Sequence, residues 1–485
     1  MKKRMMTASA VIALLLLLLS GCDFKLLSPD QLMRPPRYFG ESAGLQEAFA
    51  ETAGANAVLK APYEGEYHSA FILEDLDGDG LEEALAFYVN SLDKNICQMM
   101  LFKSDGWNWS LCANIRGEGS EVVSVSLEDM DSDGVREIVV GWGISGSQDR
   151  MLSVYMYYPD SGYLRSLSSE PYRMMSCMDL DGDYDRELLL VTTAASVSST
   201  QQDTAVPARL QAKLLKIQDT VQPNGTMAAS VTAISEVTLS SAAVNCTQMA
   251  VQPATGDSDP ATVFLDCTTK EEGMFTDILQ WTDGRLVRIQ PSDPGGSLVR
   301  DTYRTANITC RDINSDGYIE VPSQLVLAGS SNPSAVNASS STAGDAAEAA
   351  TDERVSLTVW CNFSGDKLVP IENSVINFSD SYMFLFKDDW VSGNFPNLTN
   401  NVTVVADITN RTWSFYDYDY ATQVRGSLIF AIIAHPAGAQ ITAADEVLIV
   451  EDDTLTYTLR MGPAAASRKV TQDDVVNGFI LLSNS

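Results

Sequence analysis

The chain has 485 residues, of which 45% are apolar and 20% charged, and its 64 acidic against 32 basic side chains give a formal net charge of −32. This composition is typical of a globular protein with about two to four domains, and it excludes a disordered chain and a single minimal domain. The acidic excess repels phosphate backbones, so we expect no nucleic-acid partner, and the two histidines, His68 and His435, are too few for a multi-histidine metal centre.

The N-terminus has the order of a secretory signal peptide. Three cations at positions 2–4 precede an apolar run at residues 10–19, which is shorter than a membrane-spanning helix requires. The Leu-Ser-Gly-Cys22 sequence that follows resembles the lipobox of bacterial lipoproteins; the alternative is an ordinary signal peptide with a chance cysteine. The resemblance implies a signal peptide over residues 1–21, acylation such as palmitate at Cys22, and anchoring on the extracytoplasmic face of the cell membrane.

After Cys22 we expect a lipidated tether and a short helix, together spanning residues 22–54, with the helix at residues 44–53. The remaining cysteines are odd in number and widely spread, which does not indicate a disulfide scaffold. Two pairs, Cys97 with Cys112 and Cys246 with Cys267, lie close enough in sequence to face each other, and buried free thiols are the alternative.

An acidic motif recurs four times, beginning at residues 75, 129, 179 and 312. Each copy carries oxygen-bearing side chains at its first, third, fifth and ninth places, and three copies have glycine at the sixth. The candidate metal ligands are Asp75, Asp77, Asp79 and Glu83; Asp129, Asp131, Asp133 and Glu137; Asp179, Asp181, Asp183 and Glu187; and Asp312, Asn314, Asp316 and Glu320. Such oxygens in a tight loop can converge on one hard cation, and Ca²⁺ tolerates irregular oxygen ligands better than Mg²⁺ does.

The main alternative for this motif is an EF-hand, which needs a bidentate glutamate at the twelfth place and a helix on either side. The twelfth places here are Ala86, Val140, Leu190 and Ser323. The flanking segments are short, apolar and rich in β-forming residues, so we predict a strand, a metal loop and a second strand.

Two further strands around a turn follow each of the first three copies, which begin roughly 50 residues apart, as in a propeller blade with four strands. The segment between the third and fourth copies has the same strand order without the ligand spacing, at residues 256–260, and predicts a blade that binds no metal. These residues resemble the FG-GAP and VCBS repeats of integrin-type and bacterial β-propellers. The resemblance implies a mainly β fold with a calcium-binding β-propeller of about five or more blades over residues 55–377.

The third and fourth copies depart from the family pattern, the third with Tyr184 in place of glycine and the fourth with Asn314 and Pro322. A Ser/Ala/Thr-rich stretch at residues 329–353 predicts an exposed insertion in the fifth repeat. Residues 378–485 lack the acidic motif and predict an α+β or β-sandwich domain; the alternative is that their strands close the propeller as a divergent last blade.

These features favour a monomeric, membrane-anchored lipoprotein that is not an enzyme and whose calcium-stabilised propeller binds an extracellular protein or glycan. The alternative is a secreted polysaccharide hydrolase or lyase that uses two carboxylates. No Gly-X-Ser-X-Gly nucleophile motif occurs, and the recognisable acids have the spacing of metal ligands.

Overall fold

The computed structural model describes residues 40–147, 150–194, 209–221, 227–254, 260–291, 296–330, 355–441 and 443–482. The signal peptide, Cys22, most of the tether, the 256–259 segment and nearly all of the 329–353 insertion therefore lie outside the described residues. The described part is mainly β, as expected, and consists of several antiparallel sheets. Its helices are α3 (Gly40–Ala53), α4 (Leu298–Asp301) and α6 (Gln472–Gly478), and none of them is long and apolar enough to cross a membrane.

The first four sheets follow one another along the chain, and the expected units of about four strands are confirmed. The first sheet holds β1 (Ala57–Lys60), β2 (Phe71–Glu74), β3 (Glu83–Asn90), β4 (Asp93–Ser104) and β5 (Trp109–Arg116). The second holds β6 (Glu121–Glu128), β7 (Glu137–Gly143), β8 (Arg150–Tyr158) and β9 (Tyr163–Tyr172). The third holds β10 (Met174–Met178), β11 (Glu187–Thr193), β12 (Leu210–Val221) and β13 (Met227–Thr238), and the fourth β14 (Asn245–Gln252), β15 (Thr262–Thr268), β16 (Met274–Thr282) and β17 (Arg285–Arg288).

The fifth sheet contains strands from both sides of residue 377, the expected domain boundary. It has the order β18 (Val321–Val326), β19 (Ser356–Ser364), β20 (Lys367–Asn377), β21 (Tyr382–Leu385) and β29 (Phe479–Leu481). The chain between β21 and β29 forms the hairpin of β22 (Val391–Asn394) and β23 (Asn397–Asn400) and a C-terminal sheet. That sheet has the order β24 (Val402–Asp407), β25 (Thr412–Asp419), β26 (Val424–Pro436), β28 (Leu455–Met461) and β27 (Glu446–Glu451).

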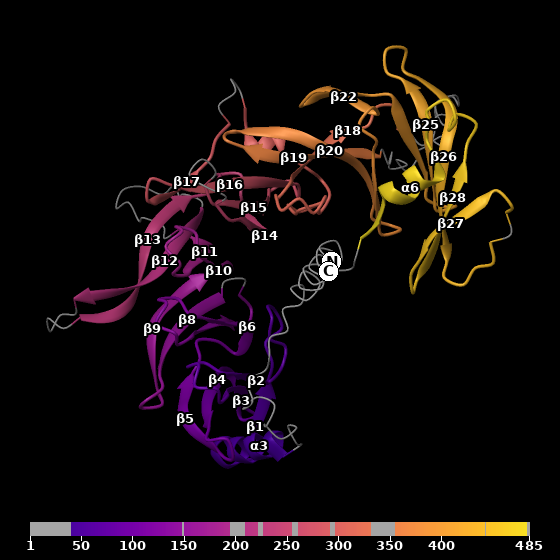
Figure 1. The fold of residues 1–485 in the computed structure, drawn as a ribbon. Helices are drawn as coiled ribbons and strands as arrows, with labels where there is room; N and C mark the ends of the chain where they lie inside the picture. Colours follow the sequence, from indigo (N-terminus) through magenta and orange to yellow (C-terminus); the bar gives the residue numbers. More distant parts are fainter. Residues whose placement is uncertain are drawn as a thin grey trace, which may run out of the picture.

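Figure 1 shows the sheets succeeding one another around an arc, from the indigo first sheet to the yellow C-terminal sheet. Separate apolar clusters lie between successive sheets. The largest joins the fifth and C-terminal sheets through residues such as Phe384, Phe415 and Phe430. Within the described ranges, no strand of the C-terminal sheet pairs with the first sheet, so strand pairing does not close the arc.

The second strand of each repeat explains why its sequence is an uninterrupted apolar run. β7 is buried at every position, and β3 and β11 are buried at all but their last residue. Both faces of these strands are covered, by neighbouring sheets and, on one face of β3, by helix α3. Helix α3 confirms the expected helix at residues 44–53, starts earlier, and packs Leu45 and Phe49 on the first sheet.

The cysteines within the described residues are free thiols. Cys246 and Cys267 are opposite each other on β14 and β15, with their sulfur atoms 3.0 Å apart. The suggested facing of Cys97 and Cys112 is wrong, because Cys97 accepts a hydrogen bond from the backbone of Gly117 and Cys112 lies at a bulge nearer the hairpin turn.

Candidate metal centres in the acidic loops

The four copies of the acidic motif form four similar loops, which we number 1 (residues 75–83), 2 (129–137), 3 (179–187) and 4 (312–320). Loops 1 to 3 each join the first and second strands of the motif, β2 to β3, β6 to β7 and β10 to β11, and loop 4 precedes β18. The sixth place has a positive φ in every copy: Gly80 86°, Gly134 89°, Tyr184 77° and Gly317 88°. Glycine is favoured there because it has no Cβ to clash, and Tyr184 adopts the same turn without that advantage.

Two hydrogen bonds repeat in all four loops and fix their shape. The first-place aspartate accepts from the backbone N–H of the sixth residue, at 3.0, 3.1, 3.1 and 2.9 Å in loops 1 to 4. The ninth-place glutamate accepts from the N–H of the second residue, at 3.0, 2.9, 2.9 and 2.8 Å. These bonds hold both carboxylates against the inside of the turn.

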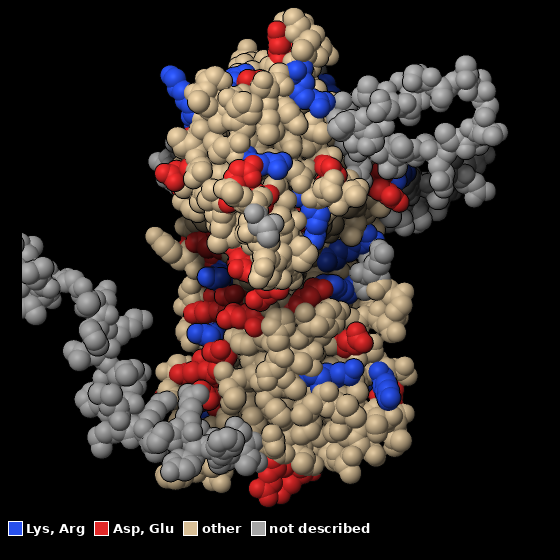
Figure 2. Space-filling view, turned by 90° about the vertical axis from the view of Figure 1, so that its right-hand side faces the viewer, with Lys and Arg blue, Asp and Glu red and all other residues tan. Residues whose placement is uncertain are grey.

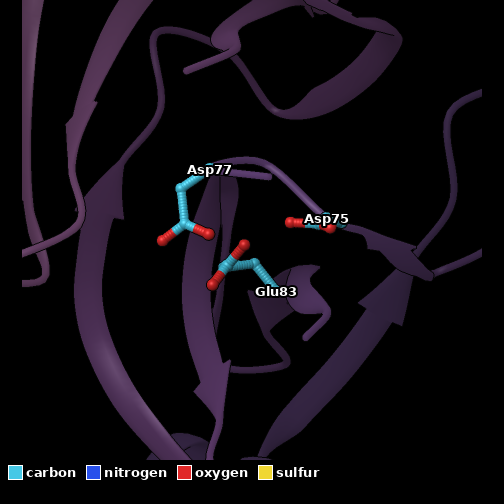
Figure 3. Close-up of side chains that lie close together, drawn as sticks. All are labelled: Asp75, Asp77 and Glu83. Atoms are coloured by element: carbon cyan, nitrogen blue, oxygen red, sulfur yellow. The ribbon is translucent and has the colours of Figure 1, made fainter. Parts of the chain in front are cut away.

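The structure brings three acids together in each of loops 1 to 3. One carboxylate oxygen from each of the first, third and ninth places lies within 4.8 Å of the others: Asp75, Asp77 and Glu83; Asp129, Asp131 and Glu137; Asp179, Asp181 and Glu187. Figure 3 shows the three carboxylates of loop 1 turned toward one another. The fifth-place carboxylates instead accept hydrogen bonds from backbone N–H groups two residues further on in all four loops.

Loop 4 does not bring three acids together in this way, because its third place is Asn314. The amide nitrogen of Asn314 donates to Asp316 at 3.0 Å. Its ninth-place glutamate, Glu320, is fully buried like the others.

The ninth-place glutamates are costly to ionise where they lie. Burial, reinforced by the neighbouring aspartates, raises the pKa of Glu83 to about 7, of Glu137 to about 8 and of Glu320 to about 7. In the described part of the chain, the Oε1 atom of every ninth-place glutamate is buried with no hydrogen-bond partner: Glu83, Glu137, Glu187 and Glu320. Oxygen donors alone, some of them buried without a partner, fit a hard cation such as Ca²⁺.

Two lysines outside the motif place their ammonium groups among the carboxylates of loops 1 and 3. Nζ of Lys103 lies 2.7 Å from Asp77, 3.3 Å from Asp79 and 3.6 Å from Glu83. Nζ of Lys216 contacts Asp183 and lies 3.1 Å from Glu187, 3.5 Å from Asp181 and 3.6 Å from Asp185. Lys216 could have been noticed, because it interrupts an apolar strand, whereas Lys103 stands at a strand end where lysine is ordinary.

An arginine at the eighth place connects each of loops 2 and 3 to the preceding loop. Arg136 pairs with Glu74 at 3.5 Å and Arg186 pairs with Glu128 at 3.1 Å, and each glutamate directly precedes the acidic loop before it. The backbone N–H of Arg136 also donates to Leu76 at 2.8 Å, and Ser132 Oγ donates to the Tyr184 carbonyl at 3.4 Å. Loops 1, 2 and 3 therefore form one connected row.

A pocket of about 1030 Å³ lies beside this row. It is lined by the first strands of the second, third and fourth sheets, β6, β10 and β14, and by the segment at residues 63–66. We call it the acidic pocket because Glu64, Glu66, Glu121 and Glu128 line it, against two arginines. Figure 2 shows Asp and Glu side chains gathered in a band across the middle of the molecule.

No family model and no curated protein matches this chain. Two solved structures align with most of its length. A β-1,3-galactosidase described as GH43 is 9% identical, with 87% of this chain and 98% of that chain covered and a TM-score of 0.21. An exo-β-1,3-galactanase from Clostridium thermocellum is 11% identical, with 84% and 82% covered and a TM-score of 0.21. Likenesses this low carry no argument about fold or activity.

Proposed function

We propose that this protein is a lipid-anchored, extracytoplasmic binding module, not an enzyme, built as a β-propeller of FG-GAP/VCBS-like blades whose acidic loops are braced by Ca²⁺. The observation that carries the proposal is the same buried carboxylate cluster at the same turn of three successive sheets. A globular protein rarely buries several carboxylates together unless a cation balances them.

The propeller arrangement is supported by the order of the sheets and by the acidic pocket. Successive antiparallel sheets pack on one another around an arc, and the first strands of three of them line one pocket. In a propeller, the first strand of each blade lies nearest the axis, where ligands reach the loops around the central channel. We assign the acidic pocket as the surface that binds a protein or a glycan.

Calcium removal tests the bracing. Extracellular oxygen sites bind Ca²⁺ at roughly 10⁻⁴ to 10⁻³ M, and free ion at tenfold above Kd stabilises the folded state by about 1.4 kcal/mol per site. We expect a chelator to lower the melting temperature by roughly 2 °C per filled site, measured by scanning calorimetry, and added Ca²⁺ to restore it. An unchanged melting temperature would argue against bound calcium.

Ligand retention tests the binding role. The full chain is immobilised and exposed to a panel of glycans and peptides, with retained and chemically converted material measured separately. For a retained ligand, Glu121→Gln is expected to weaken binding about tenfold, which corresponds to about 1.4 kcal/mol, because Glu121 lines the acidic pocket. The matched control Glu271→Gln changes an exposed glutamate elsewhere. Conversion of a glycan would favour the hydrolase or lyase alternative.

Fractionation tests the anchor, which rests on the lipobox-like sequence. We expect the wild-type chain to sediment with membranes and the Cys22→Ser variant to lose acylation, because only a cysteine supplies the thiol. Mass spectrometry of the mature N-terminal peptide measures the acyl chains. An unmodified Cys22 in the mature protein would contradict lipid anchoring.

A further inference from the structure

The four acidic loops differ in the residue that lies opposite the ninth-place glutamate on the neighbouring strand. Glu83 is opposite Lys103. In the third sheet Leu188 is opposite Leu215, so the next pair along the ladder is Glu187 and Lys216. The two lysines therefore occupy equivalent positions, and both ammonium groups reach into the carboxylates of their own loop.

In the second sheet this position holds an apolar residue. Ile138 is opposite Tyr155, so Glu137 is opposite Met156, which is buried in the core between the second and third sheets. Among the residues with described placement, no lysine or arginine forms an ion pair with Asp129, Asp131, Asp133 or Glu137. Asp131 Oδ1 and Glu137 Oε1 are both buried without a hydrogen-bond partner, and Glu137 is 0% exposed.

Loop 4 presents an extra oxygen at the same position. Val321 is opposite Cys361, so Glu320 is opposite Asn362. In the described structure, Oδ1 of Asn362 and Oε1 of Glu320 are both buried and have no hydrogen-bond partner.

Oε1 of Glu83 and Oε1 of Glu187 are also buried without a hydrogen-bond partner among the described residues, but Nζ of Lys103 lies 3.6 Å from the first and Nζ of Lys216 lies 3.1 Å from the second. An ammonium at that distance offsets the carboxylate charge, whereas the buried oxygens of loops 2 and 4 lower their free energy by ligating a cation.

We propose that the residue opposite the ninth-place glutamate decides which loops take a divalent ion. Loops 1 and 3 carry their own cation, because Lys103 and Lys216 stand where the ion would be held and repel it. Loops 2 and 4 lack an ammonium and take one ion each. This inference rests on the proposed calcium bracing and restricts it to loops 2 and 4, because lysine neutralises the carboxylates of loops 1 and 3 instead.

The number of Ca²⁺ ions bound by the wild type and by single-residue variants tests this division of the loops. The full chain, purified in detergent, is equilibrated with buffered Ca²⁺ at about tenfold above the Kd typical of extracellular sites, and bound ions are counted by calorimetric titration and by elemental analysis. We expect the wild type to bind two ions. Lys103→Met and Lys216→Met each copy the Met156 position of loop 2 and are expected to gain one ion, while Met156→Lys copies loops 1 and 3 and is expected to lose one.

Lys213→Met is the matched control. Lys213 lies on the same strand as Lys216 but pairs with Glu170 and Glu236 outside the acidic loops, so the ion count is expected to stay at two. If Met156→Lys fails to fold, the two lysine-to-methionine variants are sufficient for the test, because each is expected to gain an ion.

The outcomes separate this inference from the proposed function. A wild type that binds four ions, or lysine-to-methionine variants that gain none while the wild type binds calcium, would overturn the division of the loops and leave calcium bracing intact. A wild type and variants that bind no ion at all would overturn both.

Discussion

Replacing Arg304 by methionine is expected to lower the free energy of unfolding by about 3–5 kcal/mol, because the change leaves a buried carboxylate without its cation. Arg304 and Asp266 are both 0% exposed, and Nη2 of Arg304 lies 2.5 Å from Oδ1 of Asp266. The guanidinium also donates to the Ile308 and Thr302 carbonyls and to Thr276 Oγ1, so every side of it is occupied by an acceptor.

Denaturant unfolding followed by circular dichroism measures the loss. Arg300→Met is the control, because the Arg300 side chain is 64% exposed and its ion pair with Asp301 is expected to contribute at most about 1 kcal/mol. The double variant Asp266→Asn with Arg304→Met is expected to recover part of the loss, since no buried charge remains unpaired. Equal effects of the Arg300 and Arg304 changes would contradict this account.

The Arg304 network lies in the one repeat for which the sequence predicts no metal loop. Asp266 also accepts a hydrogen bond from the backbone N–H of Cys310, at 2.7 Å, two residues before loop 4. In the same sheet, Arg288 pairs with the fully buried Asp277 at 2.8 Å. The fourth sheet thus balances its buried carboxylates with arginines, as loops 1 and 3 do with lysines.

Local signals made the repeated sheets predictable. The acidic motif fixes where each turn lies, and the hairpin turns after it fix the remaining strands, because neighbouring strands in sequence pair with each other. The ninth-place glutamates Glu83, Glu137 and Glu187 were correctly expected to join their loops, since the spacing alone places them at the base of the turn. Pairing between strands that follow one another in the sequence carries this part of the fold.

Contacts between distant segments could not be predicted. Strand β29 pairs with β21, which lies roughly a hundred residues earlier in the sequence. Its short apolar sequence does not indicate which strand it pairs with. The place of Lys103 depends on the register between β3 and β4, because a slip of one residue would turn its side chain to the other face. The spacing also predicts Asp79 as a ligand, and in the structure its Oδ1 accepts from the backbone N–H of Leu81 while its Oδ2 lies 3.3 Å from Nζ of Lys103.

Without calcium, the protein is expected to lose stability as the pH rises from about 5 to 8. The folded-state pKa of Glu137 is raised from 4.5 to about 8, with burial as the largest cause, so the folded protein binds a proton there that the unfolded chain has released. A raised carboxyl pKa makes the folded state relatively more stable below the unfolded value and removes that advantage as the pH rises through the folded value. Glu83 and Glu320, with pKa values of about 7, act in the same direction.

Calorimetric melting of the metal-free full chain between pH 5 and pH 8 measures this effect, and we expect the melting temperature to fall by roughly 5 °C or more. Saturating Ca²⁺ is expected to reduce the fall, because an ion held by ionised carboxylates competes with protons for them. Glu137→Gln retains an oxygen that can accept from the Met130 N–H but cannot ionise, so its pH dependence should be shallower than that of the wild type. A melting temperature that rises over this range, or a Glu137→Gln profile as steep as the wild type, would show that the carboxylate of loop 2 does not control the stability of the metal-free fold.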